Sequence, residues 1–326
     1  MNGATEIPAA KGKIGMGRRR LANKAAFVWD DMKRNKLAYL FLAPFLLCFF
    51  IFIIVPVLSA SLLAFTRFNS IEAPVFVGLH NFKVMFTEDI VLMKYVIANT
   101  FFFAVFVGPV GYALQFLMAW LILQIPKKLR SLYTMAIYVP SIAGGVMMSV
   151  IWVIAFSGDR YGYLNQFLLY CGFIDTPIAF TQSSGYLMGV MIFVTLWSSM
   201  GVGFLSLQAG MMTVDPQLYE AGKMDGIRNR IQEIWYITIP AMKPQMLFSA
   251  VMGIVGALKA GGIGVQLSGT NPTPNYAGQM LQNHIEDFGF IRYELGYATA
   301  LSLMLLVLMY IINRACFRLL GTKEDE

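Results

Sequence analysis

The sequence predicts an all-helical protein that is integral to a membrane, and three observations support this fold class. Hydrophobic residues make up 57% of the 326-residue chain, charged residues make up 13%, and the mean hydropathy is +0.62. Six apolar stretches are long enough to cross a bilayer, which takes roughly 20 helical residues. Lys and Arg residues gather in alternate segments between these stretches. A soluble domain built around one core does not have this composition.

A basic segment, residues 1–36, precedes the first apolar stretch and holds nine Lys and Arg residues. Nucleic-acid binding is one interpretation of such a charge run, but cytoplasmic segments beside membrane spans also collect basic residues. The second interpretation is the stronger here, so we predict a cytoplasmic tail that binds no nucleic acid. The first apolar run begins near Leu37 and is too long for the apolar part of a signal peptide. We therefore expect no cleavable signal peptide.

The predicted transmembrane domain, residues 37–319, contains six spans, and a short C-terminal tail, residues 320–326, follows it. We place the spans near residues 37–65, 96–124, 131–156, 186–210, 245–268 and 296–318. With a cytoplasmic N-terminal tail, the cytoplasmic segments hold 19 of the 25 Lys and Arg residues, and the outer loops hold five. This distribution follows the positive-inside rule and places both termini in the cytoplasm.

The loop between the fourth and fifth spans, residues 211–243, is polar, and its sequence predicts two short helices. Asp215-Pro216 has the residue types of an N-cap and a first helical position. Gly226 is expected to end the first helix. The second helix should extend over residues 227–237 and stop before Pro240, because proline cannot continue the hydrogen bonding of a helix. We expect both helices to lie at the cytoplasmic membrane surface.

The same loop contains the segments of a known motif. Glu220-Ala221-Gly222, Asp225-Gly226-Ile227 and Ile237-Thr238-Ile239-Pro240 follow one another in it. They resemble the EAA loop of binding-protein-dependent ABC importers, where Glu-Ala-Ala, Asp-Gly-Ala and Ile-Thr-Leu-Pro occupy these places. Gly222, Ile227 and Ile239 depart from the pattern. The stretch between Gly226 and Pro240 is also one residue longer than is commonest.

This resemblance implies a type I ABC importer permease fold, in which the first helix of the loop is a coupling helix. In that family the coupling helix docks into a cleft of a cytosolic ATPase subunit, and a rigid helix can carry a rigid-body motion across such an interface. The coupling residues it implies here are Glu220, Ala221, Gly222, Asp225, Gly226, Arg228 and Pro240. An amphipathic helix that only anchors the loop in headgroups explains neither the Asp-Gly turn nor the Ile-Thr-Ile-Pro end.

Other segments resemble the carbohydrate branch of these permeases. They are Phe76–Phe82, Asn99-Thr100, Pro140, Trp152, Gly162–Asn165 and Gly296–Ser302. Residues 268–274 keep turn-forming residues but lack the glycine run that is common in the family. The resemblance implies that the solute is a sugar, and an oligosaccharide is expected. The chain as a whole looks most like permeases of the alginate oligosaccharide importer, which carry an acidic sugar.

By position, the resemblance also implies which residues line half of the solute pathway. They are Ser198, Ser199 and Val202 before the loop and Gly253, Gly256, Ala257 and Ala260 after it. Small side chains on one helix face leave room for a solute, but they also let membrane helices pack closely. Both interpretations stay open.

Lys259 is a charged residue inside the fifth predicted span. Such residues usually face a bundle interior or a water-filled cavity, so Lys259 is a candidate partner for an anionic sugar. If the residue lies nearer the outer surface, its ammonium group would instead extend to the headgroups.

The resemblance further implies a second homologous permease subunit, two cytosolic ATPase subunits and an extracytoplasmic solute-binding protein, in a bacterial cytoplasmic (inner) membrane. ATP and Mg²⁺ would be bound by the ATPase subunits, and no cofactor is expected in this chain. The sequence contains no Gly-Xaa4-Gly-Lys-Ser/Thr phosphate loop, so we expect no ATP hydrolysis by the chain itself.

Two other functional classes fit the sequence less well. A stand-alone channel or secondary transporter needs its own coupling-ion site, but few acidic residues lie within the predicted spans. A membrane enzyme needs a catalytic set, but His80 and His284 lie in outer loops, where we expect each to cap a turn. Cys48, Cys171 and Cys316 are scattered, which excludes a sequence pattern for a metal cluster or a disulfide framework.

Overall fold

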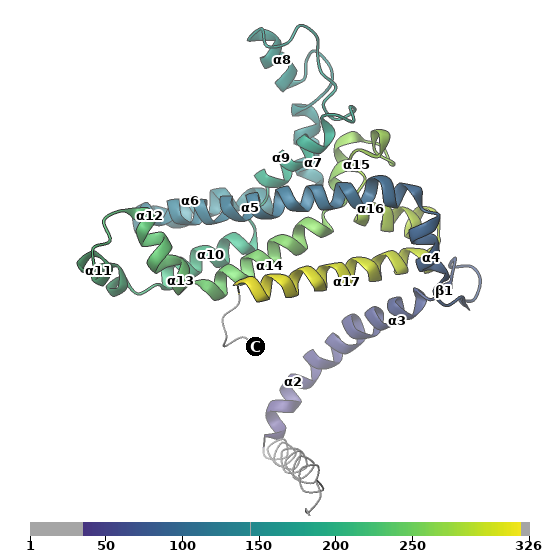
Figure 1. The fold of residues 1–326 in the computed structure, drawn as a ribbon, viewed down its shortest axis with the longest axis horizontal. Coiled ribbons are helices and arrows are strands. Elements are labelled where there is room, and N and C mark those ends of the chain that lie inside the picture. The colour runs from purple at the N-terminus through teal and green to yellow at the C-terminus, as the bar shows by residue number, and fades with distance from the viewer. Residues whose placement is uncertain (1–34, 144, 321–326) are drawn as a thin grey trace, which may run out of the picture. The chain divides into compact units, whose positions relative to one another are not determined.

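The computed structural model describes residues 35–143 and 145–320, and nearly all of the ordered elements in them are helices (Figure 1). The predicted N-terminal and C-terminal tails therefore lie almost wholly outside the described residues. The all-helical fold class is confirmed. The one sheet in the described residues is a pair of two-residue antiparallel strands, β1 and β2, in which Thr66 pairs with Phe76.

The chain divides into two compact units at Ala60 and Ser61. The described part of the N-terminal unit consists of α2 (Lys36–Phe49), the π-helical turn η1 (Phe50–Ile54) and the start of α3 (Val55–Leu63). With the last three residues of α3, which belong to the second unit, these elements form one continuous helix of 28 residues.

The second unit contains all remaining elements. In chain order they are β1 (Thr66–Arg67), β2 (Val75–Phe76), α4 (His80–Thr87), η2 (Leu92–Val96), α5 (Ile97–Gln124), α6 (Lys127–Ile142), α7 (Gly145–Ala155), α8 (Tyr163–Tyr170), α9 (Leu187–Trp197), α10 (Val202–Thr213), α11 (Pro216–Met224), α12 (Arg230–Glu233), η3 (Ile234–Thr238), α13 (Ile239–Ala241), α14 (Lys243–Lys259), α15 (Gly262–Ser268), η4 (Pro274–Tyr276), α16 (Leu281–Glu286), η5 (Asp287–Ile291) and α17 (Leu295–Leu320). Of the short elements, η2, η3 and η5 are π-helical turns and η4 is a 3₁₀ turn.

The predicted spans correspond to these helices in two ways. Within the described residues, three helices are each long and apolar enough to cross a membrane, namely residues 36–63, 92–124 and 295–318, and bent helix pairs would raise the number to five. The stretches predicted at 131–156, 186–210 and 245–268 are each divided into two helices, α6 and α7, α9 and α10, and α14 and α15. The hydropathy pattern locates these stretches but does not indicate the breaks within them.

Local residue chemistry explains two of the breaks. The chain bends by 41° between α9 and α10. At this bend the hydroxyls of Ser198 and Ser199 donate to backbone carbonyls one turn earlier and so compete with helical hydrogen bonding. Between α14 and α15, Ala260 is extended. A Cβ atom on Gly261 would lie 2.4 Å from Cβ of Gln282, so α16 can approach this point only because residue 261 is glycine.

Helices α5, α10 and α14 pack against one another at the centre of the second unit, and α17 packs on α14 (Figure 1). Three apolar clusters fill the spaces between them, with Leu301, Phe103 and Phe204 among their fully buried side chains. Lipid is as apolar as these side chains, so close van der Waals packing, rather than transfer out of water, holds such helices together.

Candidate functional site

Helix α11 begins where the sequence predicts. Oδ1 of Asp215 accepts the backbone N–H of Gln217 at 2.9 Å, and Pro216 occupies the first helical position. An N-cap side chain satisfies one of the backbone donors that the first turn leaves unpaired. The predicted N-cap and the predicted first helical residue are both confirmed.

The end of α11 is also the predicted one. Gly226 has φ of +95°, a left-handed conformation that favours glycine. Its N–H donates to the carbonyl of Lys223 at 3.3 Å, and the N–H of Ile227 donates to the carbonyl of Gly222 at 2.9 Å. These two bonds form a Schellman motif, which fixes the direction in which the chain leaves the helix.

Gly222 and Ile227, which both depart from the EAA pattern, lie in contact. A Cβ atom on Gly222 would be 3.0 Å from Cδ1 of Ile227 and 2.7 Å from Cδ1 of Ile237. The larger side chain at position 227 therefore occupies the space that a methyl group at position 222 would need. The two departures compensate for each other in volume.

The second helix of the loop differs from the prediction at both ends. It begins at Arg230, where Oδ1 of Asn229 caps the N–H of Gln232 at 2.8 Å, and it continues past Pro240 to Ala241. The π-helical turn η3 explains this continuation. Its hydrogen bonds span five residues, and Ile239 is the last residue before the proline to donate one, to Ile234. After Ala241 the chain turns by 86° into α14.

A short polar network attaches α11 to η3. The hydroxyls of Tyr219 and Thr238 are 3.0 Å apart, and Oγ1 of Thr238 also contacts the carbonyl of Glu233 at 3.3 Å. Glu233 is buried and accepts a hydrogen bond from Arg230 at 2.8 Å. The two helices of the loop are thus joined by side chains as well as by the turn at Gly226.

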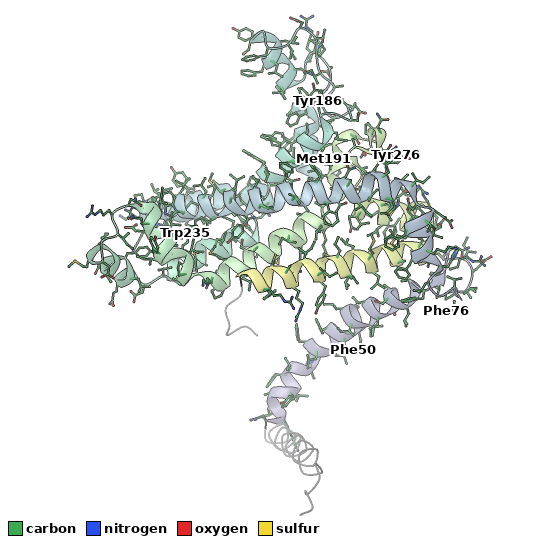
Figure 2. The ribbon with its side chains drawn as sticks, viewed as in Figure 1. Phe50, Phe76, Tyr186, Met191, Trp235 and Tyr276 are labelled. Atoms are coloured by element: carbon green, nitrogen blue, oxygen red, sulfur yellow. The ribbon has the colours of Figure 1, made fainter. Side chains whose placement is uncertain are left out.

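The opposite face of α11 is exposed within the described part of the chain. Of the predicted coupling residues, Gly222 is buried, and the exposed ones are Glu220, Ala221, Asp225, Gly226, Arg228 and Pro240. Glu220, Ala221 and Met224 lie on one helix face, and Met224 is 89% exposed. Trp235, at the same end of the second unit, is also exposed (Figure 2). The structure therefore presents six of the seven predicted residues for contact with a partner, and the coupling role of all seven stays a prediction.

A cavity of about 290 Å³ lies between α5, the α9–α10 break and α14. Six of the eight predicted pathway residues line it, namely Ser198, Ser199, Val202, Gly253, Gly256 and Ala257. Residues on the two sides of the loop therefore meet at one hollow, although their role in transport stays a prediction. Lys259 and Ala260 do not line it. Lys259 is exposed at the last residue of α14, one helical turn beyond Gly256.

Sequence reasoning missed the residue that joins the walls of this cavity. Gln115, buried in α5, donates from Nε2 to the carbonyl of Ser199 at 2.8 Å and accepts from the hydroxyl of Ser249 at 3.1 Å. Its amide adds a second hydrogen bond to the Ser199 carbonyl, which also accepts the N–H of Gly201 at 2.8 Å, and it links α5 to α14. A buried glutamine inside an apolar span was the signal that could have identified it.

Two further hydroxyls of the cavity were also missed. Tyr112 OH and Thr195 Oγ1 are buried and have no hydrogen-bond partner within the described part of the chain. An unpaired buried hydroxyl is costly, so such groups mark places where a ligand or water can bind. Both can donate and accept a hydrogen bond.

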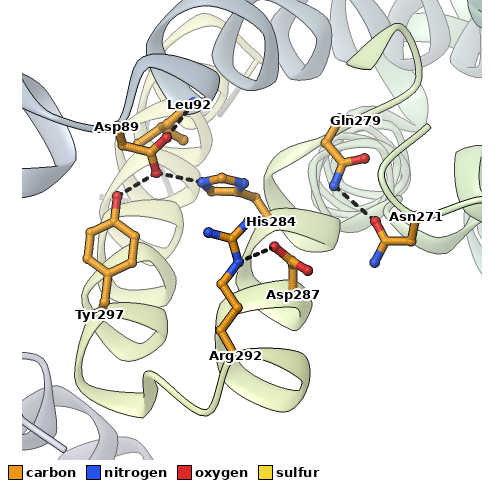
Figure 3. Close-up of polar contacts among 8 residues, drawn as sticks. All are labelled: Asp89, Leu92, Asn271, Gln279, His284, Asp287, Arg292 and Tyr297. Atoms are coloured by element: carbon orange, nitrogen blue, oxygen red, sulfur yellow. Dashed lines mark hydrogen bonds and ion pairs between the residues drawn. The ribbon is translucent and has the colours of Figure 1, made fainter. Parts of the chain in front are cut away.

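A second polar site lies where the end of α4, α16 and α17 meet (Figure 3). Oδ2 of Asp89 accepts from Tyr297 at 2.7 Å and lies 2.6 Å from Nε2 of His284. Burial alone would raise the pKa of Asp89, but the hydrogen bonds from His284, the Leu92 N–H and Tyr297 bring this pKa below its usual value. His284 is buried within α16, and its ring contacts Asp89, 195 positions away, so the expectation that it caps a turn is wrong.

This network borders a hollow of about 630 Å³ with charged walls, including Arg67, Glu72 and Glu88. Among the described residues, no group of three or more His, Cys, Asp or Glu side chains is arranged to hold a metal ion.

Known proteins share this architecture. Residues 117–319 match the model of the family described as binding-protein-dependent transport system inner membrane component. The probable ABC transporter permease protein YesP of Bacillus subtilis (strain 168) is 30% identical over 296 residues, which cover 88% of this chain and 91% of YesP. The arabinooligosaccharides transport system permease protein AraP of the same strain is 27% identical over 302 residues, covering 91% of this chain and 93% of AraP.

A solved structure has the same fold. It is a chain of a bacterial ABC transporter involved in the import of the acidic polysaccharide alginate, with a TM-score of 0.74 at 23% identity. The match covers 90% of this chain and 97% of that chain.

Proposed function

Because this chain belongs to the family of binding-protein-dependent transport system inner membrane components, we propose that it forms half of the transmembrane pathway of an ATP-driven oligosaccharide importer. The family match confirms the resemblance carried by the loop motif. The observation that carries the proposal further is the cavity at the α9–α10 break, where a broken helix and two unpaired hydroxyls meet. Irregular backbone at membrane depth is tolerated where it lines a path for polar solutes.

The chemistry of the cavity supports a sugar as the solute. Tyr112 and Thr195 offer hydroxyls that match those of a carbohydrate, and the glycines of α14 leave space beside them. AraP is named for arabinooligosaccharides, which agrees with a solute of this class. We extend the proposal to acidic oligosaccharides such as alginate fragments. An ammonium group at Lys259, one turn beyond Gly256, would pair with a sugar carboxylate.

The exposed face of α11 supports the coupling part of the proposal. In the complete importer this face docks into a cleft of an ATPase subunit on the cytoplasmic side, and the ATPase subunits bind ATP and Mg²⁺. Closure of the ATPase subunits moves α11, and the networks at Gly226 and Tyr219 pass the motion to the helices that line the cavity. The cavity then opens toward the outer side to accept sugar.

The remaining parts of the importer follow from the same proposal. A second, homologous permease supplies the other half of the pathway, and an extracytoplasmic binding protein delivers the sugar to the end that carries α4 and α16. Both termini of the chain lie in the cytoplasm, and the complex resides in the bacterial inner membrane.

ATP hydrolysis by the reconstituted complex tests the proposal. The tagged chain is purified with its subunits, placed in vesicles and supplied with binding protein and a panel of neutral and acidic oligosaccharides. One sugar class should stimulate hydrolysis, and Glu220→Arg should abolish the response, because reversing an interface charge opposes docking. Asp175→Arg, on an exposed outer loop, is the matched control and should leave ATPase copurification unchanged. Absence of any copurified ATPase would overturn the importer function in favour of a channel.

A second variant tests the charge of the solute. Lys259→Ala should reduce stimulation by acidic oligosaccharides at least fivefold and leave stimulation by neutral ones of equal length unchanged, while Lys259→Arg should retain both. Equal loss for the two sugar classes would overturn the extension to acidic solutes but leave the importer function standing.

A further inference from the structure

A separate hollow lies between α6 and the end of α10. The start of α6 and the end of α10 lie at the same end of the second unit as α11 (Figure 1). The volume of this hollow is about 670 Å³. It shares no lining residue with the cavity at the α9–α10 break. Lys127, Arg130, Thr134, Tyr138, Gln208 and Met212 are among its lining residues. We refer to it as the α6–α10 pocket.

The charged rim of the α6–α10 pocket is entirely basic. Nε of Arg130 donates to the carbonyl of Ile125 at 2.9 Å, and one of its amino groups donates to the carbonyl of Leu123 at 2.6 Å. These bonds fix the guanidinium at the corner between α5 and α6. Neither Arg130 nor Lys127 forms a salt bridge within the described residues. The pocket therefore presents positive charge that an anionic group can meet.

One acceptor atom in the inner wall of the pocket has no hydrogen-bond donor among the described residues. Gln208 is 7% exposed, and its Nε2 donates to Oγ1 of Thr134 at 2.7 Å. Its Oε1 is buried and has no partner among the described residues. Reversing the amide would not help, because the one hydroxyl proton of Thr134 already goes to the carbonyl of Arg130 at 2.8 Å. The oxygen of Gln208 is thus positioned to accept a hydrogen bond from a bound hydroxyl.

Apolar surface continues from the pocket along α6. Leu132, Met135 and Val139 are 64%, 66% and 47% exposed, and their spacing places them on one side of the helix. Met135 also lines the pocket. A ligand that bridges the basic rim and this apolar face must be amphipathic. This argument favours a lipid over a water-soluble phosphate ester.

We propose that the α6–α10 pocket binds the headgroup of an anionic phospholipid that carries a hydroxyl, with phosphatidylglycerol as the type. The phosphodiester accepts hydrogen bonds from Lys127 and Arg130, and a headgroup hydroxyl donates to Oε1 of Gln208. The acyl chains lie along the apolar face of α6. Basic pockets between membrane helices at the cytoplasmic boundary recognise lipids through this combination. The inference does not depend on which solute the cavity carries.

Lipid retention by the purified protein tests this proposal. The full-length chain, with the subunits that copurify, is placed in phosphatidylcholine nanodiscs that contain either phosphatidylglycerol or phosphatidylethanol, which has the same charge but no headgroup hydroxyl. Native mass spectrometry then counts the anionic lipids retained. Lys127→Gln should lower phosphatidylglycerol retention about fivefold, the effect of losing about 1 kcal/mol of attraction per basic residue. Lys128→Gln, an exposed neighbour that does not line the pocket, is the control and should retain wild-type binding.

Two further arms test the hydroxyl and the source of the phosphate. Gln208→Met should bind the two anionic lipids equally, whereas the wild type should prefer phosphatidylglycerol severalfold. Soluble glycerol phosphate should not compete at concentrations that match the lipid. Equal loss in Lys127→Gln and Lys128→Gln, or wild-type binding that ignores the headgroup hydroxyl, would overturn the proposal. Full competition by glycerol phosphate would overturn its assignment to a lipid.

Discussion

The α11–α13 loop and the cavity at the α9–α10 break are stabilised by contacts of different range. In the loop, the capping and network hydrogen bonds join residues at most 19 positions apart, as between Tyr219 and Thr238. At the cavity, Gln115 bonds to residues 84 and 134 positions away. The loop can therefore keep its shape while it moves as a body. The cavity wall changes whenever α5, α10 and α14 shift relative to one another, as the proposed switch between inward-facing and outward-facing states requires.

Removing the long-range contact should have the largest effect. Gln115→Leu leaves the hydroxyl of Ser249 buried without its acceptor and removes one of the two hydrogen bonds to the carbonyl of Ser199, which keeps the N–H of Gly201. We expect a loss of about 2 kcal/mol of stability, since each orphaned buried group costs about 1–3 kcal/mol and membrane hydrogen bonds lie at the low end. A thermal melt of the purified chain in detergent measures this loss.

Gln124→Leu is the matched control for this experiment. Gln124 lies at the exposed end of the same helix and makes a hydrogen bond of 3.4 Å to Trp120. Its replacement should shift the melting temperature by less than a third as much. Equal shifts would mean that Gln115 does not join the cavity walls.

A backbone change in the loop should have a smaller and more local effect. Gly226→Ala forces alanine into the left-handed region, which costs about 1–2 kcal/mol. We expect faster hydrogen exchange in residues 216–224 and a weaker ATPase response, with the helices around the cavity unchanged. Gly189→Ala is the control, because Gly189 is helical and has open space where the methyl group would go. Exchange that also increases in α14 would show that the loop is not an independent body.

Gly222 and Ile227, which compensate for each other in volume, give a second test of local contacts in the loop. Gly222→Ala alone should destabilise α11 by about 1 kcal/mol, because the new methyl group meets the flexible ends of two isoleucines. Ile227→Ala alone should also destabilise it, by opening space beside Gly222. The double variant restores the family pattern and should recover most of the loss. A double-mutant cycle on hydrogen exchange of α11 measures the coupling. If the effects of the two single substitutions on the stability of α11 simply add in the double variant, Gly222 and Ile227 do not compensate for each other.

The sequence separation of the contacting residues also explains which features the sequence could predict. Asp215, Pro216 and Gly226 act on their own neighbours, so both ends of α11 follow from residue type. The second helix was misplaced because proline was expected to stop it, whereas a π-helical turn at 234–238 precedes Pro240. A π-helical turn holds one residue more than an α-helical turn, which accounts for the one-residue excess over the commonest family spacing.

The cavity was predictable only in part. Position relative to the loop led to Ser198, Ser199 and the small residues of α14, which do meet there. The break beside Ser199 was not predicted, because an apolar run reads as an unbroken span and the cost of the break is offset by Gln115 from another helix. Tyr112 and Thr195 have no local signature at all. Their place in the cavity depends on tertiary packing, which one sequence does not display.

A change to the Asp89 network should have the smallest effect on stability. This network extends the comparison to the end of the second unit that carries α4. Asp89 and His284 lie 195 positions apart, so this contact belongs with the long-range class. The pKa of Asp89 is lower in the folded chain than its usual value of 3.8, so the ionised form stabilises the fold. This contribution is full at neutral pH and is lost as the pH falls below about 4, through the lowered pKa.

The variant Asp89→Asn should therefore melt below wild type at pH 7, and the difference should shrink as the pH is lowered toward 3. The difference in melting temperature should shrink only in this acid range, because protonation of Asp89 in the wild type removes the charge that the variant already lacks. Asp175→Asn, at an exposed carboxylate, is the control and should match wild type at every pH. A difference that stays constant down to pH 3 would mean that Asp89 acts through shape alone. The contact between Asp89 and His284 would then be a fixed part of the packing, unlike the hydrogen bonds of Gln115, which must adjust when the helices around the cavity shift.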